Sequence, residues 1–285
     1  MIVTCILSTK GGVGKTTVAA NLGAIVADAG YRVVLLDMDT QPTLSSYYTI
    51  RDRARGGVYE LMANNENRPE RIISRTSIRN LDLIISNDPQ GQLSTFLLHA
   101  PDGRLRLRNL LASFSTEFDV MIIDTQGARS VLLETAVLAA NIAVSPVVPE
   151  VLAARELHRG TLQLMKDLVP YRTLGIEPPA LKLLINNCPT ISSNARVINE
   201  ALKQMFMSSL DTTVLSTQIP AIEAYPRAAA MALPVHRLER RKPRGRIAPA
   251  ALDTMKNLAI ELLPHMREQL SKVTGSTAED YRGHA

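Results

Sequence analysis

The stretch STKGGVGKTT, residues 8–17, constrains the fold more than any other part of the chain. It directly follows the apolar run IVTCILS (2–8), and an apolar helical pattern begins at its end. Gly11, Gly12 and Gly14 allow the backbone to turn tightly and to point successive N–H groups at a phosphate. A strand, a glycine-rich turn and a helix start in this order are what a phosphate-binding loop requires. The chain is therefore predicted to bind a nucleotide after its first strand.

Two side chains of this loop carry specific predicted roles. Lys15 is expected to bridge the β- and γ-phosphates, and the Thr16 hydroxyl is expected to ligate Mg²⁺. The predicted cofactors are thus ATP and Mg²⁺. The opening glycine of the usual pattern G-x-x-x-x-G-K-[ST] would fall on Thr9, and a second lysine, Lys10, follows it. The predicted nucleotide contacts are Lys10, Gly11, Gly12, Val13, Gly14, Lys15, Thr16 and Thr17.

Short apolar runs alternate with longer stretches of helical periodicity along the chain. This alternation is typical of a parallel sheet covered by helices. We expect strands at 2–8, 32–38, 81–86, 119–124, 142–148, 181–186 and 213–217, and helices at 15–29, 56–64, 91–99, 104–115, 130–140, 151–168, 194–208 and 249–271. The predicted fold class is α/β, a mostly parallel twisted sheet flanked by helices. One domain is expected over 1–275, followed by a disordered polar tail at 276–285.

Three aspartates stand at or just beyond the ends of predicted strands. LLDMDTQPT places Asp37 and Asp39 after the second strand, and VMIIDTQG places Asp124 at the end of another. Ligands of open α/β sheets bind at the carboxyl ends of the strands, so these groups should meet the nucleotide. Asp124 is predicted to hold a metal-bound water and Asp37 to lie in the outer coordination of the metal. Asp39 is predicted to position the attacking water.

The loop resembles the ParA/MinD family of deviant Walker ATPases, whose phosphate-binding loop reads K-G-G-x-G-K-[ST]. The resemblance implies a P-loop NTPase fold, and it implies that Lys10 reaches the nucleotide of a partner subunit, so that ATP holds a homodimer together. Lys10 would then act catalytically as an arginine finger does. The segments DMDTQPT, DTQGARS, LLINNCP and IPAIEAYPRAAAMALPV extend the resemblance over about residues 1–235. LLINNCP implies an adenine contact from Asn186, with Asn187 as the rival.

The formal net charge of +5 is concentrated in HRLERRKPRGR, where six cations oppose Glu239. Such a run is either a solvated loop or a surface for a polyanion. The family resemblance implies non-specific double-stranded DNA as partner, with a ParB-like centromere-binding protein stimulating hydrolysis, although Ala221 and Ala224 stand where family members often carry DNA-contacting arginines. The predicted DNA-binding residues are Arg227, Arg237, Arg240, Arg241, Lys242, Arg244 and Arg246.

Other members of the family serve different purposes, which gives alternative interpretations. A MinD-like ATPase would bind membranes through a C-terminal basic amphipathic helix. The apolar stripe within 249–271 is instead predicted to pack in the core, so no stable membrane association is expected. An iron–sulfur role would need paired cysteines, whereas Cys5 and Cys188 belong to separate segments. The absence of a signal peptide pattern and of a disulfide framework favours the cytoplasm. The family resemblance implies that the protein associates there with the nucleoid.

Overall fold

The computed structural model describes residues 1–150, 156–189, 193–206 and 209–276, the side chains of 193–196 excepted. The described chain contains one nine-stranded sheet in the order β3-β4-β5-β2-β6-β1-β7-β8-β9. The strands are β1 Ile2–Ile6, β2 Val33–Met38, β3 Ile50–Asp52, β4 Ile73–Thr76, β5 Leu81–Ile84, β6 Val120–Thr125, β7 Ile142–Val147, β8 Leu181–Ile185 and β9 Thr212–Val214. All pairings are parallel except β3 with β4 and β4 with β5. The predicted α/β fold with a mostly parallel sheet is confirmed.

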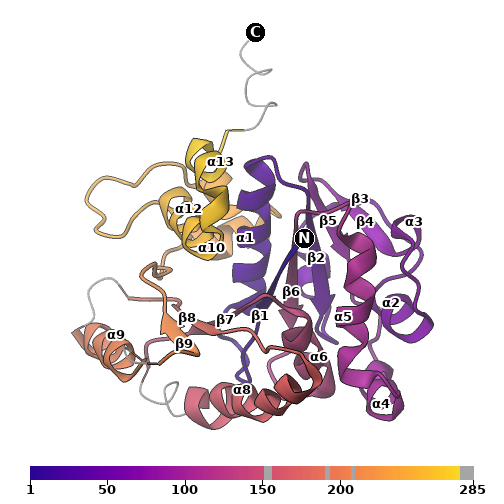
Figure 1. Ribbon diagram of the computed structural model, residues 1–285. Helices are drawn as coiled ribbons and strands as arrows, with labels where there is room; N and C mark the ends of the chain where they lie inside the picture. Colours follow the sequence, from indigo (N-terminus) through magenta and orange to yellow (C-terminus); the bar gives the residue numbers. More distant parts are fainter. Residues whose placement is uncertain (151–155, 190–192, 207–208, 277–285) are drawn as a thin grey trace.

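The helices lie on both faces of this sheet (Figure 1). They are α1 Lys15–Asp28, α2 Val58–Asn64, α3 Pro69–Ile72, α4 Gln92–His99, α5 Arg106–Leu111, α6 Val131–Ala139, α8 Gln163–Leu168, α9 Ser193–Phe206, α10 Ala224–Ala230, α11 Val235–Leu238, α12 Ala251–Leu262 and α13 Arg267–Lys272. In Figure 1, α10, α12 and α13 gather beside α1, whereas α2, α4, α5 and α6 lie on the other side.

Alternation along the central strands creates two cores. In β2, Val34 and Leu36 face the core under α2, α4, α5 and α6, whereas Val33 and Leu35 face the core under α1 and α10 to α13. All six residues of β2 are buried, as they are in β6. Continuous burial explains why these strands read as unbroken apolar runs, because helices cover both faces of a parallel sheet.

One expectation about elements was wrong, and two strands were not foreseen. The helix expected at 249–271 is interrupted at Leu263, and Pro264 begins a 3₁₀ turn, Pro264–Met266, before α13. Proline cannot donate the backbone hydrogen bond that a continuous helix needs. Strands β3 and β4 were not expected at all. They form an antiparallel edge on the otherwise parallel sheet.

The expected helix at 151–168 is described only from residue 156 onward, and 151–155 lie outside the described residues. Within it, His158–Leu162 forms a π-helical turn before α8. Most of the expected tail, 277–285, also lies outside the described residues, while Ser276 is placed against Arg240. The predicted boundary between the domain and the tail stays a prediction.

The apolar stripe of the C-terminal helices belongs to the core, as predicted. Its members are all buried in the cluster that also contains α1: Leu252, Met255, Leu258, Leu262, Met266 and Leu270. No helix among the described residues has the length and apolar character that crossing a membrane would require.

Candidate nucleotide-binding site

The glycine-rich loop turns as the sequence predicts. Gly12 and Gly14 have φ values of 72° and 86°, in the left-handed region that favours glycine, and Gly14 caps the start of α1. Any side chain at Gly14 would collide with Asn186, because a Cβ there would lie 2.3 Å from its Nδ2. The same Nδ2 donates a hydrogen bond of 2.7 Å to the carbonyl oxygen of Val13. Asn186 therefore packs against the loop and holds it by this hydrogen bond.

The Thr16 hydroxyl and Asp124 meet at the first turn of α1. Thr16 Oγ1 donates to Asp124 Oδ2 at 2.6 Å, while Asp124 Oδ1 is buried without a hydrogen-bond partner. Burial raises the pKa of Asp124 to about 7, with the Thr16 hydrogen bond opposing that rise and Asp37 adding to it. Burial also lowers the pKa of Lys15, against the opposing effect of Asp124 and Asp39. A divalent cation beside this pair would favour the carboxylate form of Asp124.

Asp37 lies beside Asp124 in the sheet register but is already engaged by the protein. Its Oδ2 accepts 2.7 Å hydrogen bonds from both the backbone N–H and the hydroxyl of Ser45, and its Oδ1 accepts from the Asp39 N–H at 3.2 Å. Burial raises the pKa of Asp37 to about 6 in spite of these hydrogen bonds. Asp37 thus fixes the loop that carries Asp39, which fits an outer rather than a direct role at a metal.

The donor set fits Mg²⁺ bound together with phosphates. Among the described residues, no three carboxylate, histidine or cysteine side chains lie together as a metal cluster of their own. Mg²⁺ characteristically uses one or two protein oxygens and completes its shell with phosphate oxygens and water. Thr16 and the unpartnered Oδ1 of Asp124 supply such oxygens at the start of α1.

A cavity of about 230 Å³ opens beside the glycine-rich loop. Its walls come from the phosphate loop, the end of β8 and the segment leading into α10, including Asn186, Asn187, Ile222 and Tyr225. Asn187 is exposed with a φ of 52°, whereas the Asn186 amide is turned toward Val13. Both asparagines that the sequence singled out therefore line one pocket, and Asn187 has the freer side chain.

Lys10 stands at the rim of the loop and forms a salt bridge within the same chain. Its Nζ lies 3.0 Å from Glu156, with 32% of the lysine side chain exposed. Glu156 precedes the π-helical turn, which packs against Thr9: a Cβ at Gly160 would lie 1.9 Å from Thr9 Oγ1, and Thr9 N donates to Thr161 Oγ1 at 3.3 Å. The residue that replaces the opening glycine thus anchors the helix carrying Glu156.

The segment after Asp124 also rests on the phosphate loop. A Cβ at Gly127 would lie 2.8 Å from Gly11 Cα, so only glycine allows this close backbone approach. Further along the same segment, Arg129 forms salt bridges with Glu134 at 3.3 Å and with Asp167 of α8 at 2.6 Å. These ion pairs tie the segment after β6 to α6 and α8.

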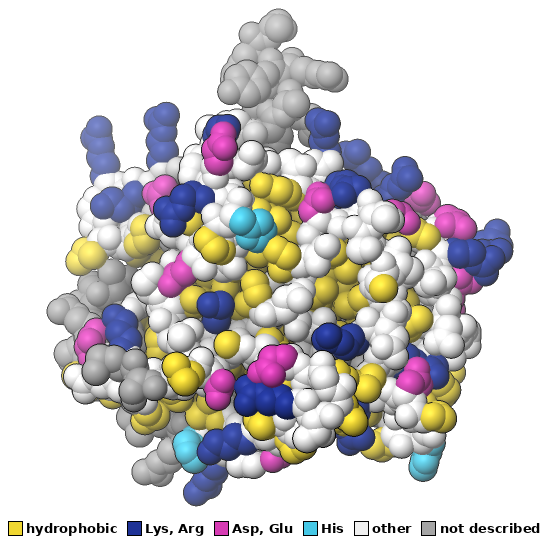
Figure 2. All heavy atoms as spheres, in the orientation of Figure 1, with side chains coloured by type: hydrophobic (Ala, Val, Ile, Leu, Met, Phe, Trp, Pro, Cys, Tyr) yellow, Lys and Arg dark blue, Asp and Glu magenta, His cyan; other side chains and the backbone are white. Residues whose placement is uncertain are grey.

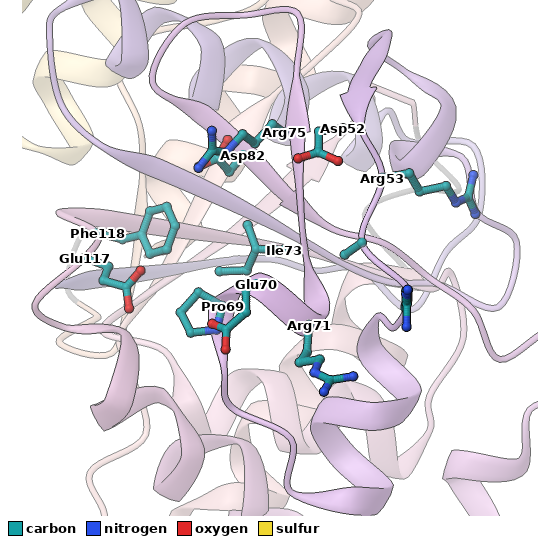
Figure 3. Close-up of a pocket in the computed structure, with 12 residues that line it drawn as sticks. Asp52, Arg53, Pro69, Glu70, Arg71, Ile73, Arg75, Asp82, Glu117 and Phe118 are labelled. Atoms are coloured by element: carbon teal, nitrogen blue, oxygen red, sulfur yellow. The ribbon is translucent and has the colours of Figure 1, made fainter.

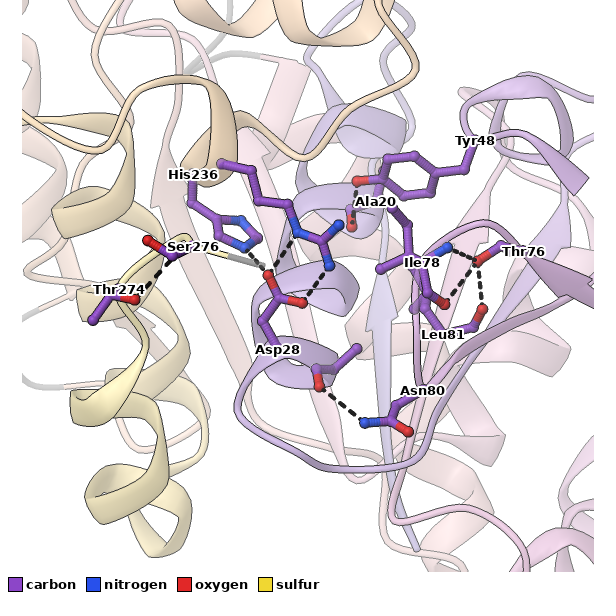
Figure 4. A network of polar contacts seen from close by, with 12 residues as sticks. Ala20, Asp28, Tyr48, Thr76, Ile78, Asn80, Leu81, His236, Thr274 and Ser276 are labelled. Atoms are coloured by element: carbon purple, nitrogen blue, oxygen red, sulfur yellow. Dashed lines mark hydrogen bonds and ion pairs between the residues drawn. The ribbon is translucent and has the colours of Figure 1, made fainter. Parts of the chain in front are cut away.

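Two predicted DNA-binding arginines form ion pairs with carboxylates of the same chain. Arg237 binds Asp28 with two hydrogen bonds of 2.8 and 2.5 Å, beside His236, whose Nε2 lies 2.8 Å from the same carboxylate (Figure 4). Arg246 makes a similar pair with Glu239, at 2.6 and 2.7 Å. These guanidinium groups fix the ends of the basic run, and we leave both out of the DNA surface proposed below.

The other basic residues of the run are differently placed. Arg241, Lys242 and Arg244 are exposed, as is Arg227 on α10, whereas Arg240 donates to the Arg237 carbonyl and to Ser276. Figure 2 shows Lys and Arg side chains projecting at the upper left of the molecule and at its right margin. The structure therefore separates the run into anchoring and exposed cations, a distinction that its sequence does not reveal.

Comparison with known proteins identifies the family. Residues 1–169 match a family model described as an AAA domain. The chromosome partitioning protein ParA of Myxococcus xanthus is 33% identical over 57% of this chain and 58% of its own length. The sporulation initiation inhibitor protein Soj of Bacillus subtilis is 29% identical over 89% of this chain and 96% of its own. The chain belongs to the ParA/MinD family of P-loop ATPases.

A solved structure agrees on the fold of this ParA/MinD family member. The ATP complex of a McdA variant from Cyanothece has a TM-score of 0.74 and 22% identity, covering 95% of this chain and 96% of that one. The match spans the sheet and both helical layers described above. The P-loop NTPase fold predicted from STKGGVGKTT is confirmed.

Proposed function

We propose that this protein is a ParA-like DNA-partition ATPase that works in the cytoplasm on the nucleoid. It binds Mg-ATP, closes into a dimer around the nucleotide, binds DNA without sequence preference and releases it after hydrolysis. The observation that carries the proposal is Lys10: a second lysine at the rim of a complete phosphate loop, with its amine held by one partly exposed carboxylate. A cation in that place can leave Glu156 for the phosphates of a facing subunit.

Each residue of the site has a distinct role in this proposal. The loop N–H groups and Lys15 hold the β- and γ-phosphates, and Lys10 of each subunit neutralises charge that develops on its neighbour's nucleotide. Mg²⁺, when bound, withdraws charge from the phosphate oxygens. Thr16 and Asp124 would hold it, and Asp39 would orient the attacking water. Hydrolysis is slow without an activating partner, because a carboxylate that only orients the attacking water is a weak general base.

The DNA contact is assigned to three exposed cations per subunit, Arg241, Lys242 and Arg244. They stand on a segment interrupted by Pro243 and Gly245, so each can approach a different phosphate without reading bases. Two subunits would neutralise about six phosphates, which gives a slope of log affinity against log salt of roughly −5. Arg227 on α10 is an additional candidate.

A gel-shift experiment with random-sequence DNA tests the proposal. The protein is mixed with DNA in ATP, in ADP or without nucleotide, and the ATP series is repeated across salt concentrations. Retention only with ATP, with the steep salt dependence given above, is the expected result. Retention that ignores the nucleotide, or the absence of retention at low salt, would refute the DNA assignment.

A ParB-like partner is proposed as the activator of hydrolysis. The expected result is a rise in phosphate release when such a partner and DNA are added to the protein in Mg-ATP. The MinD-like alternative relied on a C-terminal amphipathic helix, but the apolar residues of α12 and α13 are buried in the core. Liposome sedimentation with ATP separates the two functions, because only a MinD-like protein would sediment.

A further inference from the structure

A second pocket lies at the edge of the sheet formed by β3, whereas the phosphate loop follows the central strand β1. Its volume is about 650 Å³, within the range of small-molecule sites, and its walls come from β3, α3, β4 and the turn before β6 (Figure 3). Glu117 and Phe118 precede the first residue of β6, whereas Asp124 stands near that strand's carboxyl end. The pocket is therefore at the opposite end of β6 from the candidate nucleotide site.

One wall of this pocket carries guanidinium groups that form no salt bridge within the described chain. Arg53, Arg55 and Arg71 line it and are exposed, and no carboxylate of the described chain forms a salt bridge with any of them. Neighbouring arginines behave differently. Arg68 is bound by Glu66, and Arg75 lies opposite Asp82 in the β4–β5 pairing. The three guanidinium groups therefore have N–H donors free of salt bridges, and pairs of such donors suit phosphate oxygens.

The other wall is apolar and ends in a carboxylate. Figure 3 shows Phe118, Glu117 and Pro69 on one side of the pocket, with Ile73 between them and the side where Arg53 and Arg71 lie. Aromatic and aliphatic side chains accept the face or edge of a flat ring. An exposed carboxylate such as Glu117 accepts hydrogen bonds from ring amino groups. The pocket thus has three arginines at one end, beside Asp52, and apolar side chains with the carboxylates Glu70 and Glu117 at the other.

We propose that this pocket binds a free nucleotide as a second, regulatory ligand. The phosphates lie on Arg53, Arg55 and Arg71, and the base lies against Ile73 and Pro69, over the small exposed part of Phe118, with an amino group toward Glu117. A DNA backbone fits less well, because Asp52, Glu70 and Asp82 also line the cavity and would repel a continuous polyanion. A nucleotide places its negative charge at one end only, which matches the separation of the two walls.

Nucleotide binding to a protein whose phosphate loop is disabled tests this proposal. In the Lys15→Ala background, equilibrium dialysis with radiolabelled ATP and GTP should still detect one site per chain. Arg53→Glu with Arg71→Glu should weaken that residual binding at least about tenfold, because two charge-assisted interactions become repulsive. Arg51→Glu with Arg79→Glu is the matched control: both arginines are exposed in the same region, outside the pocket lining, and should leave binding unchanged.

Competition experiments distinguish binding in the pocket from non-specific electrostatic attraction of the phosphates. Unlabelled ATP should displace the label better than pyrophosphate or adenosine, since each of these fills one end of the pocket only. Loss of all binding in Lys15→Ala, equal loss in the control pair, or equal displacement by pyrophosphate would each overturn the proposal. Circular dichroism of each variant checks folding, and Arg53→Gln with Arg71→Gln repeats the test with the charge removed instead of reversed. These outcomes leave the ATPase proposal untouched, because it depends on the site that contains Lys15.

Discussion

Lys10 and Glu156 form a salt bridge of 3.0 Å within one chain. The amine that we propose to reach a second subunit is therefore bound by a carboxylate of its own chain. Both side chains are partly exposed, which limits the contribution of this ion pair to ~0.2–1 kcal/mol. A contact of this strength can be exchanged readily for the phosphates of a facing nucleotide. The salt bridge would therefore oppose the proposed dimerisation by only a small free energy.

Replacing Glu156 tests this competition. Glu156→Gln should lower the protein concentration at which half the chains are dimeric in ATP by up to about thirtyfold, because two Lys10 side chains per dimer no longer leave a carboxylate. Light scattering across a concentration series measures the change. Glu150→Gln removes an exposed carboxylate that forms no salt bridge with a described residue, and it should have no effect. Weaker dimerisation in Glu156→Gln would show that the contact supports the dimer.

Replacing Lys10 tests the assembly role itself. Lys10→Ala should leave nucleotide binding by the monomer nearly intact, because Lys15 and the loop N–H groups remain, but it should abolish ATP-dependent dimers. Fluorescent nucleotide titration measures the first property and light scattering the second. Dimers that persist with ATP in this variant would contradict the role assigned to Lys10.

Gly14 provides a test of how closely the loop is packed. Gly14→Ala should weaken nucleotide binding at least about tenfold, because the new methyl group meets Asn186 at 2.3 Å and the backbone has a φ of 86°. Gly12→Ala is the matched control, since Gly12 lies in the same loop and has a φ of 72° with no atom near its missing Cβ. Isothermal titration of both variants separates the collision from backbone strain. Equal losses in the two would exclude the Asn186 contact as the cause.

Asp28 makes stability depend on pH in a definite direction. Burial alone would raise the pKa of Asp28, but hydrogen bonds from Arg237 and His236 outweigh it and bring the pKa to about 2, below the ordinary value of 3.8. A carboxyl group with a lowered folded pKa stabilises the protein above its unfolded pKa. This stability, about 2 kcal/mol, is lost as the pH falls from about 4 to 2.

Asp28→Asn should therefore reduce the free energy of unfolding at pH 6, and its deficit relative to the unsubstituted protein should shrink as the pH falls below 4. Urea unfolding at a series of pH values measures the difference. Asp253→Asn changes an exposed aspartate of α12 and should show no such trend. A deficit for Asp28→Asn that stays constant down to the lowest measurable pH would rule out the ion pair as its source.

The exposed cations of the basic run give the sharpest test of DNA binding. Arg241→Glu, Lys242→Glu and Arg244→Glu together should abolish ATP-dependent DNA retention and spare ATP binding. Reversing three exposed arginines elsewhere, Arg51, Arg79 and Arg267, should retain it. Gel-shifts with random-sequence DNA at low salt measure both. Retention in the first triple variant would remove this segment from the DNA surface.

The sequence predicted the parallel part of the sheet because buried parallel strands are continuous apolar runs, as VVLLDM and VMIIDT are. It did not reveal β3 and β4, because a short edge strand such as Ile50–Asp52 contains arginine and aspartate instead of an apolar pattern. The interruption of the C-terminal helix was marked by Pro264. The regular apolar stripe on both sides of it outweighed that signal.

The sequence predicted the site residues that belong to local motifs. It did not predict the ion pairs between residues that are far apart in the sequence. Lys15, Thr16 and Asp124 follow from motifs at strand ends, and the structure brings Thr16 and Asp124 within 2.6 Å. Arg237 was assigned to DNA because its partner, Asp28, is 209 residues away in the sequence. The same applies to Glu156, since no local pattern places it beside Lys10. Long-range ion pairs of this kind leave no periodic signal.

The double burial of β2 and β6 has a consequence for how ATP could alter this molecule. Asp37 and Asp124 sit on adjacent strands that are packed from above and below, and neither carboxylate has any exposed surface. Shifting either one would require both cores to repack, which close-packed interiors resist. We therefore expect loss of the γ-phosphate to be sensed by the chain that follows each strand, at Asp39 and Gly127, while the two acids stay where they are.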